Sequence, residues 1–317
     1  MNAKSFGLLL LTALFTAGCH HKDLVYGSAE TKVIDVVFDW SDDPDADPQS
    51  MALYLYPIDG GSPLRYEFSG KTGGSIRVPF GTYDALCINS DNTDWVHLSS
   101  TDKRYTFNIN DGELSEVSEQ DESEYAALYR RCGESLDGNK VYENPRGLWT
   151  GSVDSFQVIA SPVNQTLTIV PEDALRYYTV DIIDVEGLAD DGSGIPAMLG
   201  GMSDGIDALT RSSSTNQVSY PFILQQVTRA GNALHAEFTT FGEDFQSHPA
   251  HNLWAMVKLP DGTWKVQSTD VTEQVHQAAD SRHVHIVIQG MSIPHSGSGG
   301  LTADVNDWDS ENITLKM

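Results

Sequence analysis

The feature that most constrains the fold of this 317-residue chain is an alternation of apolar and polar residues with a period of two. In the stretch KVIDVVFDW, every second residue from Ile34 onward is apolar, and Asp35 and Asp39 stand between them. Because successive side chains of a β-strand point to opposite faces, this stretch predicts a strand with one buried face. Similar short stretches recur between turn residues, without alternating long helices, and this favours β-sandwiches over an α/β fold.

A second phrase, SIRVPFGTYDALCINS, narrows the type of sandwich. A strand leads into the turn Pro-x-Gly-x-Tyr, which ends at Tyr83, and a new strand follows. This order is typical of transthyretin-like Greek-key sandwiches. We therefore predict an all-β fold of two tandem transthyretin-like Greek-key β-sandwich domains. The residues predicted for the first core are Ile34, Phe38, Val78, Tyr83 and Leu86.

The strand series divides into two parts of similar length. We expect an N-terminal sandwich over residues 31–147 and a C-terminal sandwich over residues 148–317, joined near residues 145–165. Residues 111–147 are acidic and polar, and we interpret them as an excursion from the first sandwich, with one short helix near Glu122–Arg131. The glycine-rich stretch GSGIPAMLGGMSDGIDAL predicts a loop or a short helix that covers the end of a sheet.

The N-terminus carries the pattern of an exported lipoprotein. Lys4 precedes a short apolar segment over residues 6–15, which is too short to span a bilayer, and small residues then lead to Cys19. We interpret residues 1–18 as a lipoprotein signal peptide, Cys19 as the lipid-attachment residue, and residues 19–30 as a tether. Two or three acyl chains on Cys19 would anchor the mature chain stably to a membrane.

The composition is strongly acidic. The formal net charge is -26, and it becomes about -27 without residues 1–18, which hold one lysine and no acid. Such a surface repels phosphate backbones, so we expect no nucleic-acid partner. Apart from Cys19, the cysteines are Cys87 and Cys132. A disulfide between them remains open, but a buried Cys87 and an unpaired Cys132 are favoured.

Several clusters of polar residues are candidate metal sites, but the sequence favours a different interpretation for each of them. Aspartates are dense between Asp39 and Asp47, and such oxygens can bind calcium, yet the EF-hand glycine is missing and a solvated turn is favoured. His283 and His285 share one strand face, with His276 upstream, but ordinary strand histidines are favoured over a zinc site. His20 and His21 are expected to be tether residues.

No catalytic motif stands out, so we expect no enzymatic activity, no catalytic residue, no cofactor and no metal site. Three tryptophans, Trp95, Trp254 and Trp264, could stack on sugars if they were exposed, although tryptophans on strands more often belong to the core.

The chain resembles a known lipoprotein family. The similarity lies in CHHKDL, VVFDWSDDPDADPQSMALYLYPIDGG, LRYEFSGKTGGSIRVPFGTYDALCINSD, DVTEQVHQAADSRHVHIVIQGMSIP and DVNDWDSENITLKM. The family is a domain of unknown function from gut-type Gram-negative anaerobes, related to the fimbrillin superfamily and nearest to FimB-like fimbrial anchor proteins. The resemblance implies two transthyretin-like sandwiches, outer-membrane attachment through Cys19, fimbrillin-type pilus subunits as partners, and no catalytic residues.

One sequence feature helps to choose a role within that superfamily. Stalk fimbrillins are matured by cleavage after a basic residue, typically arginine, near the N-terminus, which opens a groove for a neighbour's strand. Between Cys19 and Arg65, this chain has only Lys22 and Lys32 as basic residues. We therefore expect a non-enzymatic fimbrial anchor or accessory subunit at the cell surface, acting in adhesion. The alternative is a glycan-binding surface lipoprotein of a nutrient-uptake system.

Overall fold

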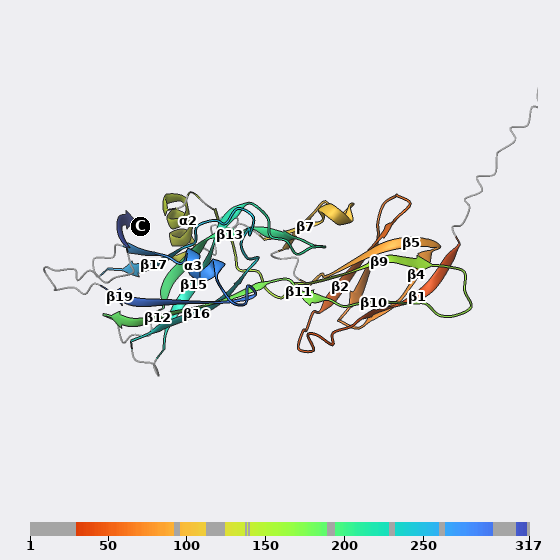
Figure 1. Cartoon of the computed structure of the whole chain (residues 1–317), viewed down its shortest axis with the longest axis horizontal. Coiled ribbons are helices and arrows are strands. Elements are labelled where there is room, and N and C mark those ends of the chain that lie inside the picture. Colours follow the sequence, from red (N-terminus) through yellow and green to blue (C-terminus); the bar gives the residue numbers. More distant parts are fainter. Residues whose placement is uncertain are drawn as a thin grey trace, which may run out of the picture.

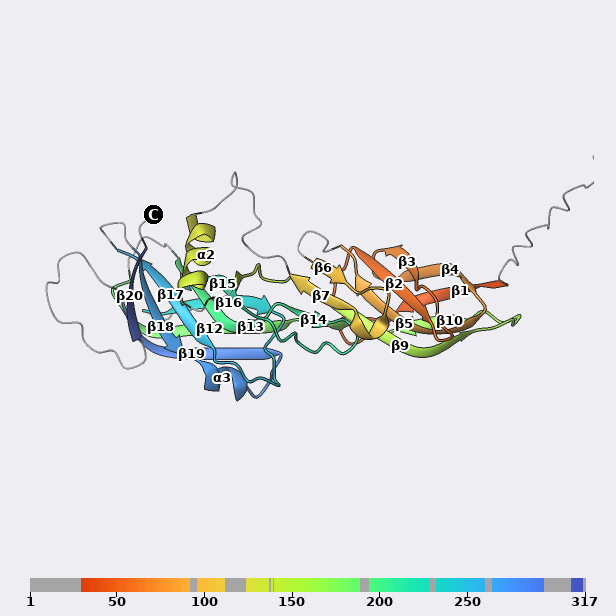
Figure 2. The ribbon, with the colours of Figure 1, turned by 90° about the horizontal axis from the view of Figure 1, so that it is seen from above.

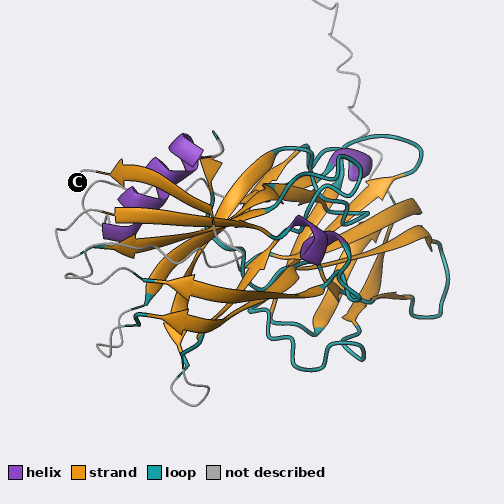
Figure 3. Cartoon of the chain, turned by 60° about the vertical axis from the view of Figure 1, so that its left-hand side comes forward, coloured by secondary structure: helices purple, strands orange, loops and turns teal. Residues whose placement is uncertain are grey.

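The structure is a computed structural model that describes residues 30–91, 96–111, 124–136, 138, 140–188, 194–227, 232–259, 264–293 and 309–315. The molecule is elongated, and its strands form two sandwiches that follow one another along the long axis (Figure 1). Helices are few and short, and strands dominate both parts (Figure 3). The predicted all-β fold of tandem sandwiches is therefore confirmed.

The first sandwich packs a three-stranded sheet against a five-stranded sheet. The smaller sheet has the order β10 (Thr166–Ile169), β1 (Thr31–Phe38) and β4 (Gly73–Pro79). The larger sheet has the order β11 (Glu172–Asp173), β9 (Trp149–Val158), β5 (Gly81–Asn89), β2 (Ser50–Pro57) and β3 (Leu64–Ser69). Strand β1 is antiparallel to β4 and parallel to β10, so it is an inner strand with partners on both sides.

The predicted residues of the first core are all buried. Ile34, Phe38, Val78 and Tyr83 pack together between the two sheets. Leu86 is also buried, but it faces the opposite side of β5 and joins a larger core. The Tyr83 hydroxyl donates a hydrogen bond of 3.0 Å to the carbonyl of Pro79, which ties the start of β5 to the end of β4.

Judged by strand pairing, the boundary between the two sandwiches lies further along the chain than the boundary predicted from the sequence. Strands β9, β10 and β11 pair with β5, β1 and β9, so residues up to Asp173 belong to the sheets of the first sandwich. A division by pairing therefore falls after Asp173, whereas the predicted C-terminal sandwich starts at residue 148. By returning to the first sandwich, the chain covers edges of β1 and β5 that would otherwise be exposed.

The second sandwich is one nine-stranded sheet that folds over on itself. Its order is β19 (His283–Ser292), β12 (Arg176–Glu186), β16 (Leu234–Thr240), β15 (Gln217–Gln226), β13 (Ile195–Ser203), β17 (Asn252–Lys258), β18 (Trp264–Asp270) and β20 (Asp309–Leu315), with β8 (Lys140–Val141) beside β15. The sheet turns over at strand β15, which takes part in both layers. Its residues 217–224 pair with β13, and Gln225 and Gln226 pair with β16.

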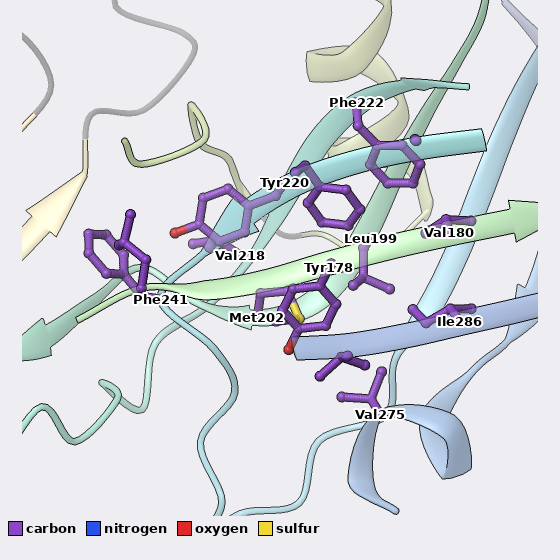
Figure 4. Close-up of a cluster of buried hydrophobic side chains, with 14 of the residues drawn as sticks. Tyr178, Val180, Leu199, Met202, Val218, Tyr220, Phe222, Phe241, Val275 and Ile286 are labelled. Carbon is purple, nitrogen blue, oxygen red and sulfur yellow. The ribbon is translucent and has the colours of Figure 1, made fainter. Parts of the chain in front are cut away.

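The two layers of this folded sheet enclose the largest core of the molecule. Tyr178 and Val180 of β12 face Leu199 of β13 and Phe222 of β15, and Ile286 of β19 completes this layer (Figure 4). These aromatic and branched side chains remove apolar area from water, which stabilises this part of the molecule.

The glycine-rich stretch predicted to be a loop or short helix is a central strand, so that prediction was wrong. It forms β13, which pairs with β15 on one side and β17 on the other. Eight of its nine residues are buried, all except Ile195, so both faces lie in a core and no alternation appears. Gly200 and Gly201 fall where the register with β15 shifts between Leu199 and Met202.

The helix predicted near Glu122–Arg131 exists as α2 (Glu124–Leu136), but it packs on the second sandwich. Leu128 and Cys132 lie against Met198 and Trp254 on the outer face of the β13–β17 layer. The excursion expected to belong to the first sandwich thus covers the second. Cys87 and Cys132 are both buried and free, in separate cores, so they form no disulfide.

A small sheet connects the two sandwiches. It contains β6 (Val96–Ser99), β7 (Asn108–Asp111) and β14 (Gly205–Asp207), and η1 (Arg104–Thr106) precedes β7 (Figure 2). Phe107, between η1 and β7, is fully buried in the largest core. That core therefore runs from the back of the first sandwich into the second. No helix in the described residues is long and apolar enough to cross a membrane.

Candidate functional site

The N-terminal end of β1 is the point from which the predicted tether would leave the protein. Strands β1 and β4 lie at one end of the long axis, and β17 and β20 lie at the other (Figure 2). The Lys32 ammonium donates to the carbonyl oxygens of Ser161 and Val163, at 2.8 and 2.7 Å. The start of β1 is thereby fixed to the loop between β9 and β10. Cys19, His20 and His21 lie outside the described residues.

The folded sheet of the second sandwich ends at β19 on one side and at β20 on the other. Part of the terminal stretch NITLKM lies in β20, and this strand pairs antiparallel with β18. Edge strands carry backbone N–H and C=O groups that can pair with a strand of another chain.

The aspartates between Asp39 and Asp47 border a cleft of about 410 Å³ at the junction of the sandwiches. Asp43 accepts a hydrogen bond of 2.8 Å from the Trp149 indole, and Asp39 accepts one of 3.0 Å from the Ser41 backbone. The hydrogen bonds from Ser41 hold the pKa of Asp39 below its ordinary value. These two carboxylates are occupied by protein donors, which fits the favoured interpretation of a turn.

His283 and His285 lie on the exposed face of β19, as the alternation predicts, but His276 is not near them in a common site. His283 Nδ1 lies 2.9 Å from Asp280, and His285 Nε2 lies 2.6 Å from Asp181. Each of these two histidines thus has its own carboxylate partner, as is common for ordinary strand histidines.

His276 belongs to a different cluster, which sequence reasoning missed. Glu243 follows β16, His251 directly precedes β17, and His276 ends the short helix α3 (Thr272–His276). One ligand atom from each lies within 4.8 Å of the other two. His251 is fully buried, the Glu243 side chain is 2% exposed, and that of His276 is 21% exposed. The sequence signal was Glu243, His248 and His251 within the single connection FGEDFQSHPAHN.

The Glu243 carboxylate is the centre of this cluster. Its Oε2 atom lies 2.9 Å from His251 Nε2 and 2.8 Å from His276 Nε2. The first pair is a hydrogen bond, whereas the second lacks the alignment of one, so the buried His276 Nε2 has no hydrogen-bond partner. On the other side of its ring, His251 Nδ1 lies 3.0 Å from the carbonyl oxygen of Gly200.

Backbone contacts hold the three side chains in place. The His251 N–H donates to Thr272 Oγ1 at 2.8 Å, and the Val271 N–H donates to the His251 carbonyl at 2.9 Å, which joins the start of β17 to α3. Gly201 has φ +76°, and a Cβ there would lie 2.9 Å from His251 Nδ1 and overlap the carbonyl of Ala250. A glycine is therefore required where β13 passes under the imidazole.

The tryptophans considered for sugar stacking are not exposed where the structure describes them. Trp254 and Trp264 are 4% and 3% exposed and belong to the core beneath α2. Trp95 lies outside the described residues. The interpretation of these two strand tryptophans as core residues is confirmed.

Fold and sites together define an all-β protein of two tandem sandwiches, with its N-terminal strand at one end and its C-terminal strand at the other. Residues 18–222 match the family described as Domain of unknown function (DUF5119), and the chain belongs to that family. A comparison with curated protein sequences finds no match.

Solved structures of bacterial proteins share this fold. A candidate adhesin from Bacteroides ovatus is 17% identical, with a TM-score of 0.64 over 89% of this chain and 99% of that one. The fimbrial anchor protein Mfa2 from Porphyromonas gingivalis is 14% identical, with a TM-score of 0.50 over 81% of this chain and 91% of that one. At such identities the similarity establishes the fold and no more.

Proposed function

We propose that the protein is a non-enzymatic, lipid-anchored surface subunit that holds or accompanies a fimbria in adhesion. Cys19 would carry the lipid, residues 19–30 would form the tether, and the outer membrane would be the site of attachment. Fully extended, this tether reaches about 40 Å, which separates an acidic protein from the membrane surface. Support comes from the sequence motif and from a fold shared with the fimbrial anchor protein Mfa2.

The observation that carries an anchor role, as opposed to a shaft role, is the position of β1. A shaft subunit needs a removable first strand, whereas β1 is paired with both β4 and β10. Cleavage after Lys32 would leave nearly all of β1 in its sheet, and the Lys32 side chain is itself bound to two carbonyls. Proteolysis at the available basic residues would therefore open no groove.

The opposite end of the molecule is the natural side for a partner. A chain tethered before β1 would direct β20 and the rest of the second sandwich away from the membrane (Figure 2). Addition of a fimbrillin strand to an edge such as β20 would satisfy a row of backbone hydrogen bonds at once. This mode of binding requires no active site.

The test of the role is co-purification from solubilised outer membranes, with the Cys19→Ala variant as the matched control. We expect fimbrillin subunits to be recovered with the wild-type chain, and Cys19→Ala to release the chain from the membrane fraction. Recovery of a glycan transporter in place of fimbrillins, or pili of normal number and length after deletion of the gene, would overturn the anchor role. Unchanged membrane fractionation of Cys19→Ala would overturn the lipid anchor.

A further inference from the structure

We propose that Glu243, His251 and His276 form a binding site for a divalent transition-metal ion, with Zn²⁺ as the best match. The proposal is independent of the fimbrial role, because it rests on the cluster alone. Two imidazole nitrogens and one carboxylate oxygen are a ligand set that suits Zn²⁺ and leaves a fourth position open.

The hydrogen bond to Gly200 determines which nitrogen of His251 can bind a cation. A backbone carbonyl only accepts hydrogen bonds, so the Nδ1 atom that faces it at 3.0 Å carries a proton. The neutral imidazole then directs its Nε2 lone pair at the Glu243 carboxylate, 2.9 Å away. A lone pair facing a carboxylate requires a cation between them, either a proton or a metal ion.

His276 favours a metal ion over a proton. A proton on His251 Nε2 would satisfy that nitrogen and Glu243, but it would leave His276 Nε2 buried without a hydrogen-bond partner, 2.8 Å from the same oxygen. A metal ion accepts electron pairs from all three atoms at once. Leaving a buried polar atom unsatisfied is costly, so the convergence of three donor atoms points to a shared ion.

The surroundings supply what metal-bound histidines usually have. A ligating imidazole normally donates its other N–H to a carbonyl or carboxylate, and Gly200 provides that carbonyl for His251. Glu243 and His251 are nearly inaccessible, whereas His276 is 21% exposed and leaves a side from which an ion can enter. The exposed His248 ring lies edge-on to His276, 5.3 Å away, so water or His248 could complete the coordination.

The distances are compatible with loading by a small shift. Bonds of about 2.0–2.1 Å in a tetrahedron separate two ligand atoms by roughly 3.3 Å. The two pairs at Glu243 Oε2 are separated by 2.9 and 2.8 Å, so the carboxylate needs to move by about half an ångström. Rotation of the Glu243 side chain supplies this movement, and the partly exposed His276 ring can adjust its distance to the His251 nitrogen, which lies within 4.8 Å.

The experiment uses the full chain, solubilised in detergent, purified without a histidine tag and dialysed against a chelator. It is titrated with ZnCl₂ by calorimetry, and Co²⁺ absorption in the visible range reports the coordination geometry. We expect one tight Zn²⁺ per chain, a tetrahedral Co²⁺ spectrum, and affinity losses of about tenfold or more in Glu243→Gln and His276→Gln. The matched control His285→Gln, outside the cluster, should bind as the wild type does.

Folding is checked with the metal-free proteins, because His276→Gln should keep the wild-type circular dichroism spectrum and differ in melting temperature only when Zn²⁺ is added. The proposal is overturned if the wild type takes up no Zn²⁺, or if both cluster variants bind it as the wild type does. It is equally overturned if His285→Gln abolishes binding, which would assign the ion to the exposed face of β19.

Discussion

Asp181 organises the exposed face of β12 and β19 at the scale of single residues. Its carboxylate accepts from His235 Nδ1 at 2.8 Å and from His285 Nε2 at 2.6 Å. Burial alone would raise the pKa of Asp181, but the hydrogen bonds from both histidines outweigh it and the net shift is downward. The hydrogen bond to Asp181 likewise raises the pKa of His235, although burial opposes it.

The hydrogen bond between Asp181 and His235 predicts that the stability of the protein depends on pH. Because the folded-state pKa of His235 is raised, its contribution to stability is complete below about pH 6.5 and is lost as the pH rises through the folded value. We expect an NMR titration to give His235 a pKa above 6.5, and Asp181→Asn to lower it. Asp184→Asn, on the same strand, is the control that should leave it unchanged. A wild-type value at or below 6.5 would contradict the prediction.

The two buried thiols predict low reactivity. Burial raises the pKa of both Cys87 and Cys132 to about 12, and only the thiolate attacks disulfide reagents. In a Cys19→Ala chain these are the only cysteines. We expect no reaction with Ellman's reagent in the native protein and reaction of both thiols after unfolding. Rapid reaction of either thiol in the native state would show that its core opens readily.

At the scale of elements, two backbones pack closely where β4 meets β1. Gly73 has φ +91°, and a Cβ there would overlap the carbonyl oxygen of Val36. Its neighbour Gly74 has ordinary backbone angles and would place a Cβ 3.5 Å from the Phe68 ring, which is a normal contact. The two glycines are adjacent in sequence, but only Gly74 has room for an added side chain.

We therefore expect Gly73→Ala to lower the free energy of unfolding by about 1–3 kcal/mol more than Gly74→Ala does. The physical reason is the combination of a left-handed backbone and a clash with backbone, neither of which a side-chain rotation relieves. Urea unfolding of the two variants measures the difference. Equal midpoints would mean that β1 and β4 can separate at this position without loss.

The same elements show what the sequence could and could not predict. Strands with one buried face, such as β1 and β19, were evident because their side chains alternate between core and solvent. Strand β13 was missed because both of its faces are buried, and the return of β9 to the first sandwich was missed because strand pairing leaves no local signal. The Glu243 cluster was missed because His276 is distant in sequence and meets His251 only through α3.

At the scale of the whole molecule, the two sandwiches share a continuous hydrophobic core. The largest core contains Tyr54 and Ile88 of the first sandwich together with Tyr178 of the second, and Phe107 lies between them. Phe107 packs edge-to-face on Tyr54 at 5.1 Å, and its carbonyl accepts from the Ala208 N–H at 2.7 Å. In the proposed tethered role, force on one end of the molecule would pass through this junction to the other end.

This continuity predicts that the sandwiches unfold together. Wild-type protein should show one calorimetric transition, and Phe107→Ala should remove about 3–5 kcal/mol and separate the transition into two, because it empties the core at the junction. Phe68→Ala is the control: Phe68 lies in the core confined to the first sandwich, so its loss should lower stability without uncoupling the two parts. Two transitions in the wild type would show that the sandwiches are not coupled. A single transition in Phe107→Ala would show that other contacts, such as the pairing of β7 with β14, are enough to couple them.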